Sequence, residues 1–219
     1  MDWPLLGSML SINIFIYHHW VYPTFLQYYA RSRAADNKDD TFKSRKYAAN
    51  DVDAELPNIT IVMPVYNEAK FLADKLTNLL TLDYPADKLN VVLGFDGCLD
   101  NSVEIANQYK EQFEFHGISF DLDIDEINHG KVHVINKLLK RYKSKSEILV
   151  LSDVSALISI DAMQIFAHRM AEDGVGVVTG DYKLFEHGSK GEAHYWNYQR
   201  NIRKAESITG SIIGPPGAL

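Results

Sequence analysis

The chain has 219 residues, of which 46% are hydrophobic and 23% are charged. This composition is enough for one folded domain plus an accessory segment, and it excludes a disordered or fibrous chain. Acidic residues outnumber basic ones by 29 to 22, which gives a net charge of −7, so we expect no nucleic-acid partner. The single cysteine, Cys98, can form no internal disulfide, which favours a reducing environment for the folded part.

The first thirty residues are almost free of charge. No Asp, Glu, Lys or Arg lies between Trp3 and Ala30, and as a helix this stretch would be roughly 42 Å long, whereas about 20 apolar residues cross a bilayer. Five aromatic residues gather at its end, and six basic residues follow: Tyr17, Trp20, Tyr22, Tyr28 and Tyr29, then Arg31, Arg33, Lys38, Lys43, Arg45 and Lys46. We therefore expect residues 1–30 to form a membrane-anchor helix.

The distribution of basic residues also predicts the orientation of that anchor. Because they follow the apolar run, the N-terminus should lie outside the cell membrane and the remaining chain in the cytoplasm. Asn13, His18, His19 and Pro23 interrupt the apolar run, so an interfacial helix, or one docked on the folded domain, stays an alternative. A cleaved signal peptide is disfavoured, because no basic residue precedes the run and no small-residue cleavage site follows it.

A polar segment separates this region from the rest of the chain. Residues 31–56 alternate in charge and lack apolar periodicity, so we interpret them as a linker with a helical turn near Tyr47.

Residues 57–219 alternate short β-branched runs with longer helical patterns. The expected strands are Ile59–Met63, Val91–Phe95, Ile118–Ile124 and Ile148–Leu151, with a fifth at Val175–Thr179. The expected helices are Asn67–Leu82, Asn101–Phe115, Lys131–Tyr142, Ile160–Glu172 and one from Tyr195 to Ser207. This order predicts an α/β domain with a mostly parallel sheet flanked by helices.

The residues just after each strand are where such a sheet binds ligands. Four polar segments occupy these positions: Pro64 to Glu68, Asp96 to Ser102, Asn128 to Lys131, and Ser152 to Ser155. Taken singly, they also have ordinary explanations. Asp96 and Asp100 suit turns and helix caps, Lys131 suits a solvated surface, Asp153 suits a strand end and Tyr66 suits simple packing. Lys131 nevertheless opposes the helix dipole, which would make sense beside an anion such as a diphosphate.

Together and in this order, the four segments resemble the nucleotide-sugar half of a family 2 glycosyltransferase with a GT-A fold. The matching motifs are Pro-Val-Tyr-Asn-Glu at 64–68, Asp-Gly at 96–97, Asn-His-Gly-Lys at 128–131 with Asn136, and Ser-Asp-Val-Ser at 152–155. Three later segments resemble membrane-bound polysaccharide synthases of this family: Thr179 to Asp181, the expected helix from Tyr195 to Ser207, and Gly214 to Leu219.

The resemblance implies a role for each matching residue. Tyr66 would stack on the base, Glu68 would lie beside the nucleotide, and Asp96 would accept a hydrogen bond from the base. Lys131 would neutralise the diphosphate, while Asp153, with Ser155, would hold Mg²⁺ or Mn²⁺.

The sequence also departs from the family pattern. Phe95 stands where a first Asp is frequent, Cys98 where Ser is frequent and Gln199 where Glu is frequent, and Ser155 replaces a stronger carboxylate ligand. An inverting transferase needs a base that deprotonates the acceptor hydroxyl. In the family this base and the Gln-x-x-Arg-Trp motif follow the glycine-rich segment, so they are expected beyond Leu219, and the 57–219 domain is expected to be incomplete at its C-terminus.

The expected function is therefore a membrane-anchored inverting glycosyltransferase, or its donor-binding part. It would transfer a sugar from a nucleoside-diphosphate sugar, expected to be UDP-linked, to a glycan or lipid acceptor. The alternative is a catalytically inactive nucleotide-sugar-binding or assembly subunit, whose partner carries the acceptor half. A nucleotidyltransferase is disfavoured, because Pro64 to Glu68 contains no glycine-rich loop.

Overall fold

The computed structural model describes residues 3–34, 46–47, 51–181 and 190–214. The chain divides into two compact units, residues 1–40 with 181–215 and residues 41–180 with 216–219. Among the described residues, the first unit contains the helices α1 (Trp3–Ile16), α2 (Tyr22–Ala34) and α7 (Lys190–Thr209) with the turn η1 (Tyr17–Val21), and the second contains the β-sheet with the helices around it. Each unit is described separately below.

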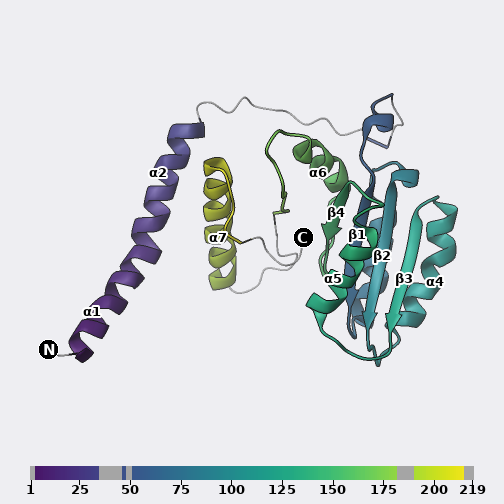
Figure 1. Ribbon diagram of the computed structural model, residues 1–219, viewed down its shortest axis with the longest axis horizontal. Coiled ribbons are helices and arrows are strands. Elements are labelled where there is room, and N and C mark those ends of the chain that lie inside the picture. Colours follow the sequence, from purple (N-terminus) through teal and green to yellow (C-terminus); the bar gives the residue numbers. More distant parts are fainter. Residues whose placement is uncertain (1–2, 35–45, 48–50, 182–189, 215–219) are drawn as a thin grey trace. The chain divides into compact units, whose positions relative to one another are not determined.

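The sheet consists of four parallel strands. They are β1 (Ile59–Val65), β2 (Leu89–Asp96), β3 (Ser119–Asp125) and β4 (Ile148–Leu151), in the spatial order β3-β2-β1-β4. Every hydrogen-bonded pair is parallel, so all four arrowheads in Figure 1 point to the same edge. Chain order reverses between β1 and β4, since β2 and β3 extend the sheet on one side of β1 and β4 is added on the other.

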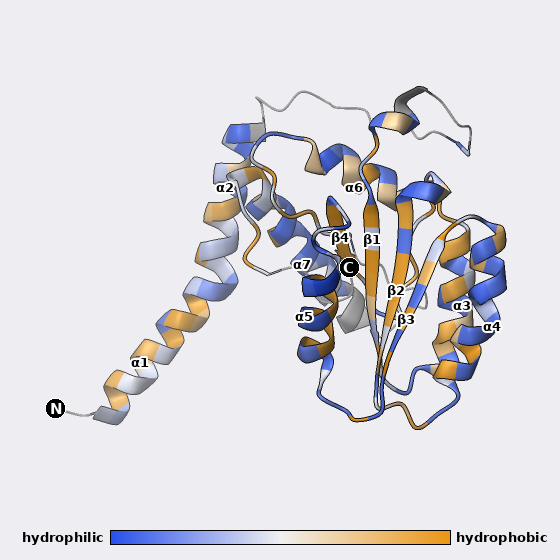
Figure 2. Cartoon of the chain, turned by 45° about the vertical axis from the view of Figure 1, so that its right-hand side comes forward, coloured by the Kyte–Doolittle hydropathy of each residue, from blue (hydrophilic) through white to orange (hydrophobic). Residues whose placement is uncertain are grey.

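Alternate residues of the central strands build two separate cores, because successive side chains of a strand point to opposite faces. Ile61, Met63 and Leu93 pack in the larger core with α3 (Ala69–Leu80), α4 (Ser102–Phe115) and α6 (Ala162–Met170). Val62 and Val92 face the other side and pack against α5 (Lys131–Tyr142). Strands buried on both faces read as continuous apolar runs, which is the orange colouring of β1 and β2 in Figure 2.

The structure confirms four of the five expected strands and places α3 to α6 within two residues of the expected starts and ends. The fifth expected strand, Val175–Thr179, is wrong, because these residues form no regular secondary structure. Val177 is 71% exposed, and within the described ranges no strand pairs with this segment. A β-branched run needs a neighbouring strand to become a strand, and local sequence does not supply one.

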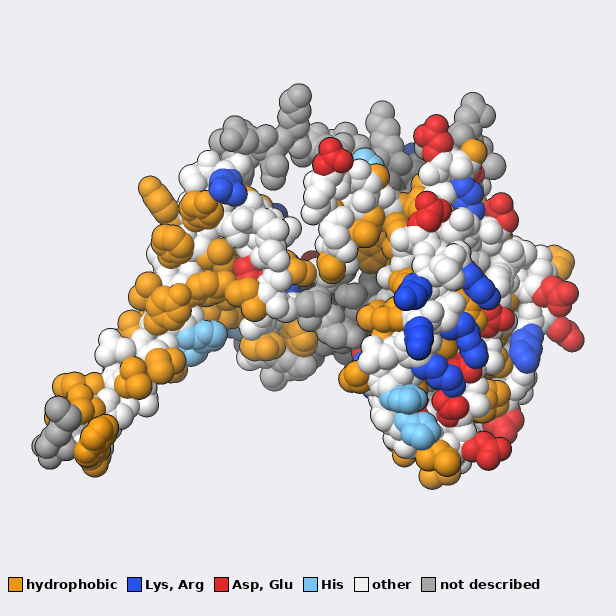
Figure 3. All heavy atoms as spheres, viewed as in Figure 1, with side chains coloured by type: hydrophobic (Ala, Val, Ile, Leu, Met, Phe, Trp, Pro, Cys, Tyr) orange, Lys and Arg blue, Asp and Glu red, His pale blue; other side chains and the backbone are white. Residues whose placement is uncertain are grey.

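A row of ion pairs holds α5 on the outer strand β3. Lys137 contacts Asp123 and Asp125 at 2.7 and 2.8 Å, and Arg141 contacts Asp123 at 3.3 Å. The two aspartates raise the pKa of Lys137, and Lys137 in turn lowers the pKa of Asp125. Figure 3 shows Lys and Arg side chains gathered over α5. The pairs fix the register of α5, whose first residue is Lys131.

The other unit is helical. Helices α1 (Trp3–Ile16) and α2 (Tyr22–Ala34) are joined by a π-helical turn, η1 (Tyr17–Val21), and α7 (Lys190–Thr209) packs against α2. Leu26, Ala30 and Ala205 form a small core between α2 and α7. The Tyr22 hydroxyl donates a 2.7 Å hydrogen bond to the buried carboxylate of Glu206. That hydrogen bond raises the pKa of Tyr22 to about 12.

The apolar side chains of α1 are exposed, as Figure 3 shows along its length. Within residues 3–34, 46–47, 51–181 and 190–214, no helix is both long enough and apolar enough to cross a membrane. The expected anchor helix is therefore unconfirmed.

The expected linker is described only in part. Helix α2 continues through Arg31 to Ala34, and a short 3₁₀ helix, η2, covers Asp51–Glu55. A turn is present at Lys46 and Tyr47, but both residues have positive φ angles, 51° and 58°, so it is not the expected helical turn. The Tyr47 backbone N–H donates to Asp83 at 2.8 Å. Residues 35–45 and 48–50 of the expected linker lie outside the described residues.

Candidate donor-binding site

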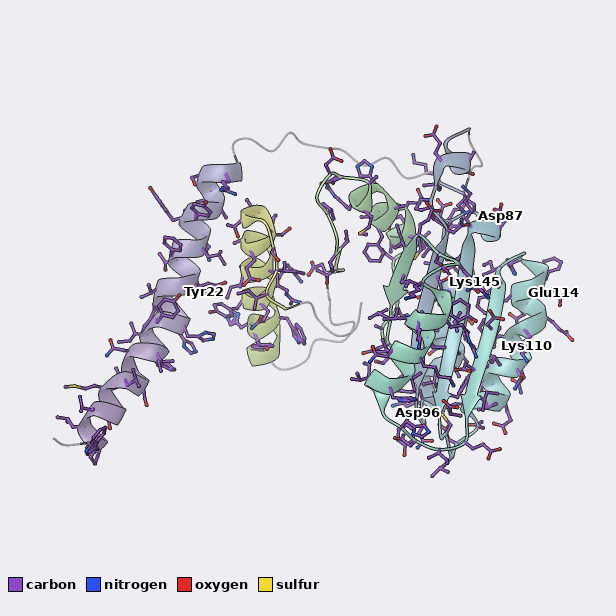
Figure 4. All side chains as sticks on the ribbon, in the orientation of Figure 1. Tyr22, Asp87, Asp96, Lys110, Glu114 and Lys145 are labelled. Carbon is purple, nitrogen blue, oxygen red and sulfur yellow. The ribbon has the colours of Figure 1, made fainter. Side chains whose placement is uncertain are left out.

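The candidate residues lie along the carboxyl edge of the sheet. Figure 4 shows Asp96 at the edge where the strands end, and Asp87 at the opposite edge. Parallel α/β sheets bind ligands outside their carboxyl ends, at the point where strand order reverses. Here that point lies between β1, which leads to Tyr66, and β4, which leads to Asp153.

The loops that follow β1 and β2 brace one another. Asn67 has a left-handed backbone, with φ of 53°, and its side-chain oxygen accepts a 2.8 Å hydrogen bond from the Leu99 N–H. In return, Asp100 accepts from the Ala69 N–H at 3.0 Å, and the Ser102 hydroxyl accepts from the Glu68 N–H at 3.1 Å. Two backbone amides at the start of α3 are thus satisfied by side chains at the start of α4.

Asp100 fills the helix-capping role that its sequence position suggested. It accepts from both the N–H and the hydroxyl of Ser102, at 3.1 and 2.6 Å. Burial acts to raise the pKa of Asp100, but hydrogen bonds from Ser102 and Ala69 outweigh it, so that the pKa is lowered. The Asp100 carboxylate therefore joins the loop after β1 to the loop after β2.

Tyr66 and Glu68 stand on this braced loop. The Tyr66 ring, directly after β1, is 50% exposed, and half-buried Glu68 immediately precedes α3. An exposed flat ring at a strand end suits stacking on a base, which stays a prediction for Tyr66. The role of Glu68 beside the nucleotide also stays a prediction.

Asp96 is only 2% exposed, and its carboxylate is already engaged by backbone amides. One oxygen accepts from the His129 N–H at 2.7 Å, and the other accepts from the Gly130 N–H at 2.8 Å. Gly130 is the N-cap residue of α5. The negative charge at the amino terminus of this helix is therefore supplied by the Asp96 carboxylate. Asp96 thereby ties the β2 edge to the loop that carries Lys131, and its expected contact with the base stays a prediction.

Gly97 permits this close approach of the two loops. Its φ of +65° lies in the left-handed region, and a Cβ added there would meet the Asn128 backbone nitrogen at 2.6 Å. Both the backbone conformation and the lack of space require glycine at this position.

Lys131 and Asp153 are brought together by the fold. Lys131 begins α5 and Asp153 follows β4, yet the ammonium and carboxylate form an ion pair of 2.6 Å. The side chain of Lys131 is 52% exposed, so this pair contributes little to stability. It does place one positive and one negative group side by side at the edge where a diphosphate and its cation are expected.

The ligands for a divalent cation are only partly present. Asp153 offers a carboxylate that already holds a cationic group, and exposed Ser155 offers a hydroxyl two residues later. Both are oxygen donors, and Mg²⁺ is commonly bound by one or two carboxylates together with substrate phosphates. Among the described residues no cluster of three or more His, Cys, Asp or Glu side chains could hold a metal ion. The donor set therefore fits a cation that a bound diphosphate helps to hold.

The sequence did not single out Lys75 or Asn78, one helical turn apart on α3. Asn78 donates to the Ile158 carbonyl at 2.9 Å and accepts from the Ile158 N–H at 2.8 Å. The Lys75 ammonium donates to the Ser152 hydroxyl at 2.7 Å. The available signal was a lysine at a position of the apolar stripe formed by Leu72, Leu76 and Leu79, which are all buried.

Comparison with solved structures defines the fold class. The mannosyltransferase PcManGT from Pyrobaculum calidifontis, solved in complex with GDP-Man and Mn²⁺, superposes with a TM-score of 0.62. The match has 24% sequence identity and covers 88% of this chain and 49% of that one. The fold is therefore of the GT-A kind, an α/β fold with a parallel sheet flanked by helices.

Comparison with protein families defines the family. The family model Glycosyl transferase family 2 matches residues 60–217, and the chain belongs to this family of glycosyltransferases. Two curated relatives are poly-beta-1,6-N-acetyl-D-glucosamine synthases. The Staphylococcus aureus protein is 25% identical over 209 residues, which cover 93% of this chain and 47% of the relative. The Staphylococcus epidermidis protein is 21% identical over 213 residues, covering 95% and 48%. The chain thus spans about half the length of these relatives.

Proposed function

We propose that the chain binds a nucleoside-diphosphate sugar and transfers its sugar, with inversion, to a glycan or lipid acceptor. The observation that carries the proposal is the Lys131–Asp153 ion pair at the reversal point of the sheet. A donor of this class leaves as a diphosphate, so the site must stabilise negative charge as the sugar departs.

Each site residue has a separate task in this proposal. Lys131 binds the diphosphate directly, because its exposed ammonium can move from Asp153 to a phosphate oxygen. Asp153, with Ser155, would hold Mg²⁺ or Mn²⁺, which acts as a Lewis acid on the diphosphate when bound. Tyr66 stacks on the base and Glu68 lies beside the nucleotide. Asp96 accepts from the base through lone pairs that the two loop amides leave available.

UDP is the nucleotide we propose for this donor. The relatives named above are poly-beta-1,6-N-acetyl-D-glucosamine synthases, whereas PcManGT was solved with GDP-Man and Mn²⁺. Both nucleotides therefore belong in the test. The acceptor hydroxyl needs a base, and we propose that a residue outside this 219-residue sequence supplies it, on the same polypeptide or on a partner subunit.

The experiment is ligand-induced stabilisation of the full chain, with UDP or GDP added in the presence of Mn²⁺ or Mg²⁺. Ligand at about 100 times its dissociation constant should stabilise the folded chain by about 2.7 kcal/mol. Asp153→Asn and Lys131→Met should abolish the shift, and Lys110→Met, an exposed lysine on α4, is the matched control. If neither nucleotide diphosphate stabilises the wild-type chain, the proposal is wrong.

A non-catalytic donor-binding subunit is the second candidate. Ser155 is a weaker ligand than a carboxylate, and Phe95, which is buried, replaces a frequent aspartate. This candidate predicts nucleotide binding without sugar transfer and without hydrolysis of the donor. Hydrolysis of a UDP-sugar that disappears in Asp153→Asn would exclude it.

We also propose that α1 and η1 associate with the cell membrane, with the sheet unit on the cytoplasmic side. The support is the exposed apolar surface of α1, followed by the basic residues Arg31 and Arg33 at the end of α2. Partition of the full chain into vesicles, compared with a Leu6→Asp/Leu10→Asp variant, tests the proposal. Equal partition of the two proteins would refute it.

A further inference from the structure

Lys75 is buried in a place where a charge is costly. Its side chain is 0% exposed, and it projects from α3 beside Leu72, Leu76 and Leu79, which are all buried. Moving an ammonium group out of water costs several kcal/mol even after the protein relaxes. Leucine or methionine at this position would fill the same core without that cost. The lysine therefore calls for an explanation other than core packing.

The hydrogen bonds of Lys75 point to one short segment. Its ammonium donates to the Ser152 hydroxyl at 2.7 Å and to the Ala156 carbonyl. Ser152 immediately precedes Asp153, and Ala156 closes a turn in which its own N–H donates to the Asp153 carbonyl at 3.2 Å. Lys75 thus donates hydrogen bonds to both ends of the five-residue segment from Ser152 to Ala156. Asp153 and Ser155 lie between these two contacts.

Neighbouring contacts strengthen this arrangement. Asn78, one turn further along α3, makes its paired hydrogen bonds to Ile158, and the Ser152 N–H bonds to the Val62 carbonyl at 3.1 Å. Side chains of helix α3 therefore hold the backbone from Ser152 to Ile158 in place through hydrogen bonds. Asn78 fixes the distal part, whereas Lys75 acts directly under Asp153.

We propose that Lys75 is a positioning residue for the cation and diphosphate site, which holds the segment from Ser152 to Ala156, and with it the Asp153 carboxylate, in one orientation. This inference rests on the proposed function. Electrostatics support it: burial lowers the pKa of Lys75 to about 7, and the charge of Asp153 acts to raise it, so the two groups interact. Asp153 is then flanked by Lys131 at the surface and by Lys75 from the core side.

The test measures Mn²⁺ affinity of the full chain in the presence of UDP, by the loss of the electron paramagnetic resonance signal of the hydrated ion. Removal of a group that orients a metal ligand typically lowers metal affinity roughly 10- to 100-fold. We expect that loss in Lys75→Met without a parallel loss of thermal stability. Lys110→Met, which removes an exposed lysine, should retain full affinity.

A second variant distinguishes positioning from general damage to the fold. Ser152→Ala removes one of the two groups to which Lys75 donates a hydrogen bond. It should also weaken Mn²⁺ binding, but by a smaller factor than Lys75→Met does. If the two residues act through one contact, the double variant should lose no more affinity than Lys75→Met alone.

Three results would overturn the inference: unchanged Mn²⁺ affinity in Lys75→Met, losses of affinity and of stability that run in parallel, or full additivity in the double variant. If Lys75→Met does not fold, wild-type affinity in Ser152→Ala overturns it instead. Failure of the wild-type chain to bind Mn²⁺ and UDP would contradict the proposed function itself, which is a separate outcome.

Discussion

Replacing Lys75 with methionine should change how the stability of the sheet unit depends on pH. The pKa of Lys75 falls from 10.5 to about 7 in the folded chain, first because burial penalises the charged amine, while Asp153 acts in the opposite direction. Between these two values the unfolded chain holds a proton that the folded chain lacks. The contribution of Lys75 to the stability of the wild type therefore rises with pH in this window.

The magnitude follows from linkage. The contribution of one such group changes by about 1.4 kcal/mol per pH unit inside the window. Over the whole window it amounts to roughly 5 kcal/mol, and between about pH 7 and about pH 9 to roughly 3 kcal/mol. Below pH 7 the amine is charged in both states, so its contribution becomes constant. Methionine carries no proton, and the variant lacks this term at every pH.

The assay must report on the sheet unit alone. The three tryptophans, Trp3, Trp20 and Trp196, belong to α1, η1 and α7, so their fluorescence reports on the helical unit. Urea-dependent hydrogen exchange of peptides from β1 and β2 measures the stability of the sheet directly. The quantity compared is the wild-type stability minus that of Lys75→Met, because the other titrating groups cancel in this difference.

The unfolding free energy of the wild type minus that of Lys75→Met should increase by roughly 3 kcal/mol as the pH rises from about 7 to about 9. A difference that stays constant with pH would show that Lys75 has an ordinary pKa in the folded chain. The reasoning from its burial would then be refuted.

Three further predictions concern packing and pairing. Gly94→Ala would place a Cβ 2.3 Å from Cγ1 of Val134 on α5, and we expect it to destabilise the sheet unit by roughly 1–3 kcal/mol; Gly176→Ala, with nothing within 4 Å, should be neutral in the same urea titration. Lys137→Met removes the partner that lowers the pKa of Asp125. The variant should lose stability near neutral pH and equal the wild type once the pH has fallen through that lowered pKa, as acid titration would show. Tyr22→Phe removes the hydroxyl donor of the α2–α7 contact and should cost the helical unit roughly 1–3 kcal/mol in urea unfolding followed by tryptophan fluorescence; an unchanged midpoint would contradict this.

The strands and helices of the sheet unit could be predicted from the sequence because their signals are local. Ile59 to Val65 is an apolar run, interrupted by Thr60, that a parallel sheet buries on both faces. The stripe of leucines on α3 marks its buried side in the same way. The segment 175–179 has the same β-branched composition but no neighbour to pair with among the described strands. Composition could not reveal this, because strand pairing is a contact between distant parts of the chain.

The candidate site shows the same division. The order of polar segments after four apolar runs was enough to predict where Tyr66, Asp96, Lys131 and Asp153 would gather, because parallel strands bring their carboxyl ends to one edge. The contacts that each residue makes were not predictable. Asp96 accepts from two backbone amides of the loop between β3 and α5, and Lys131 pairs with Asp153, 22 positions further along the chain.

The sequence by itself determined the chain order of strands and helices, the edge of the sheet at which the candidate site residues lie, and the family, because apolar periodicity and short motifs depend on neighbouring residues. Only the tertiary structure decided that the buried Lys75 donates to Ser152 beside Asp153, that Asp96 accepts from the Gly130 amide at the start of α5, and that β1 lies between β2 and β4. These features depend on which distant segments meet. The free energy of burying a charge or pairing a strand is set by those neighbours, and not by the residue alone.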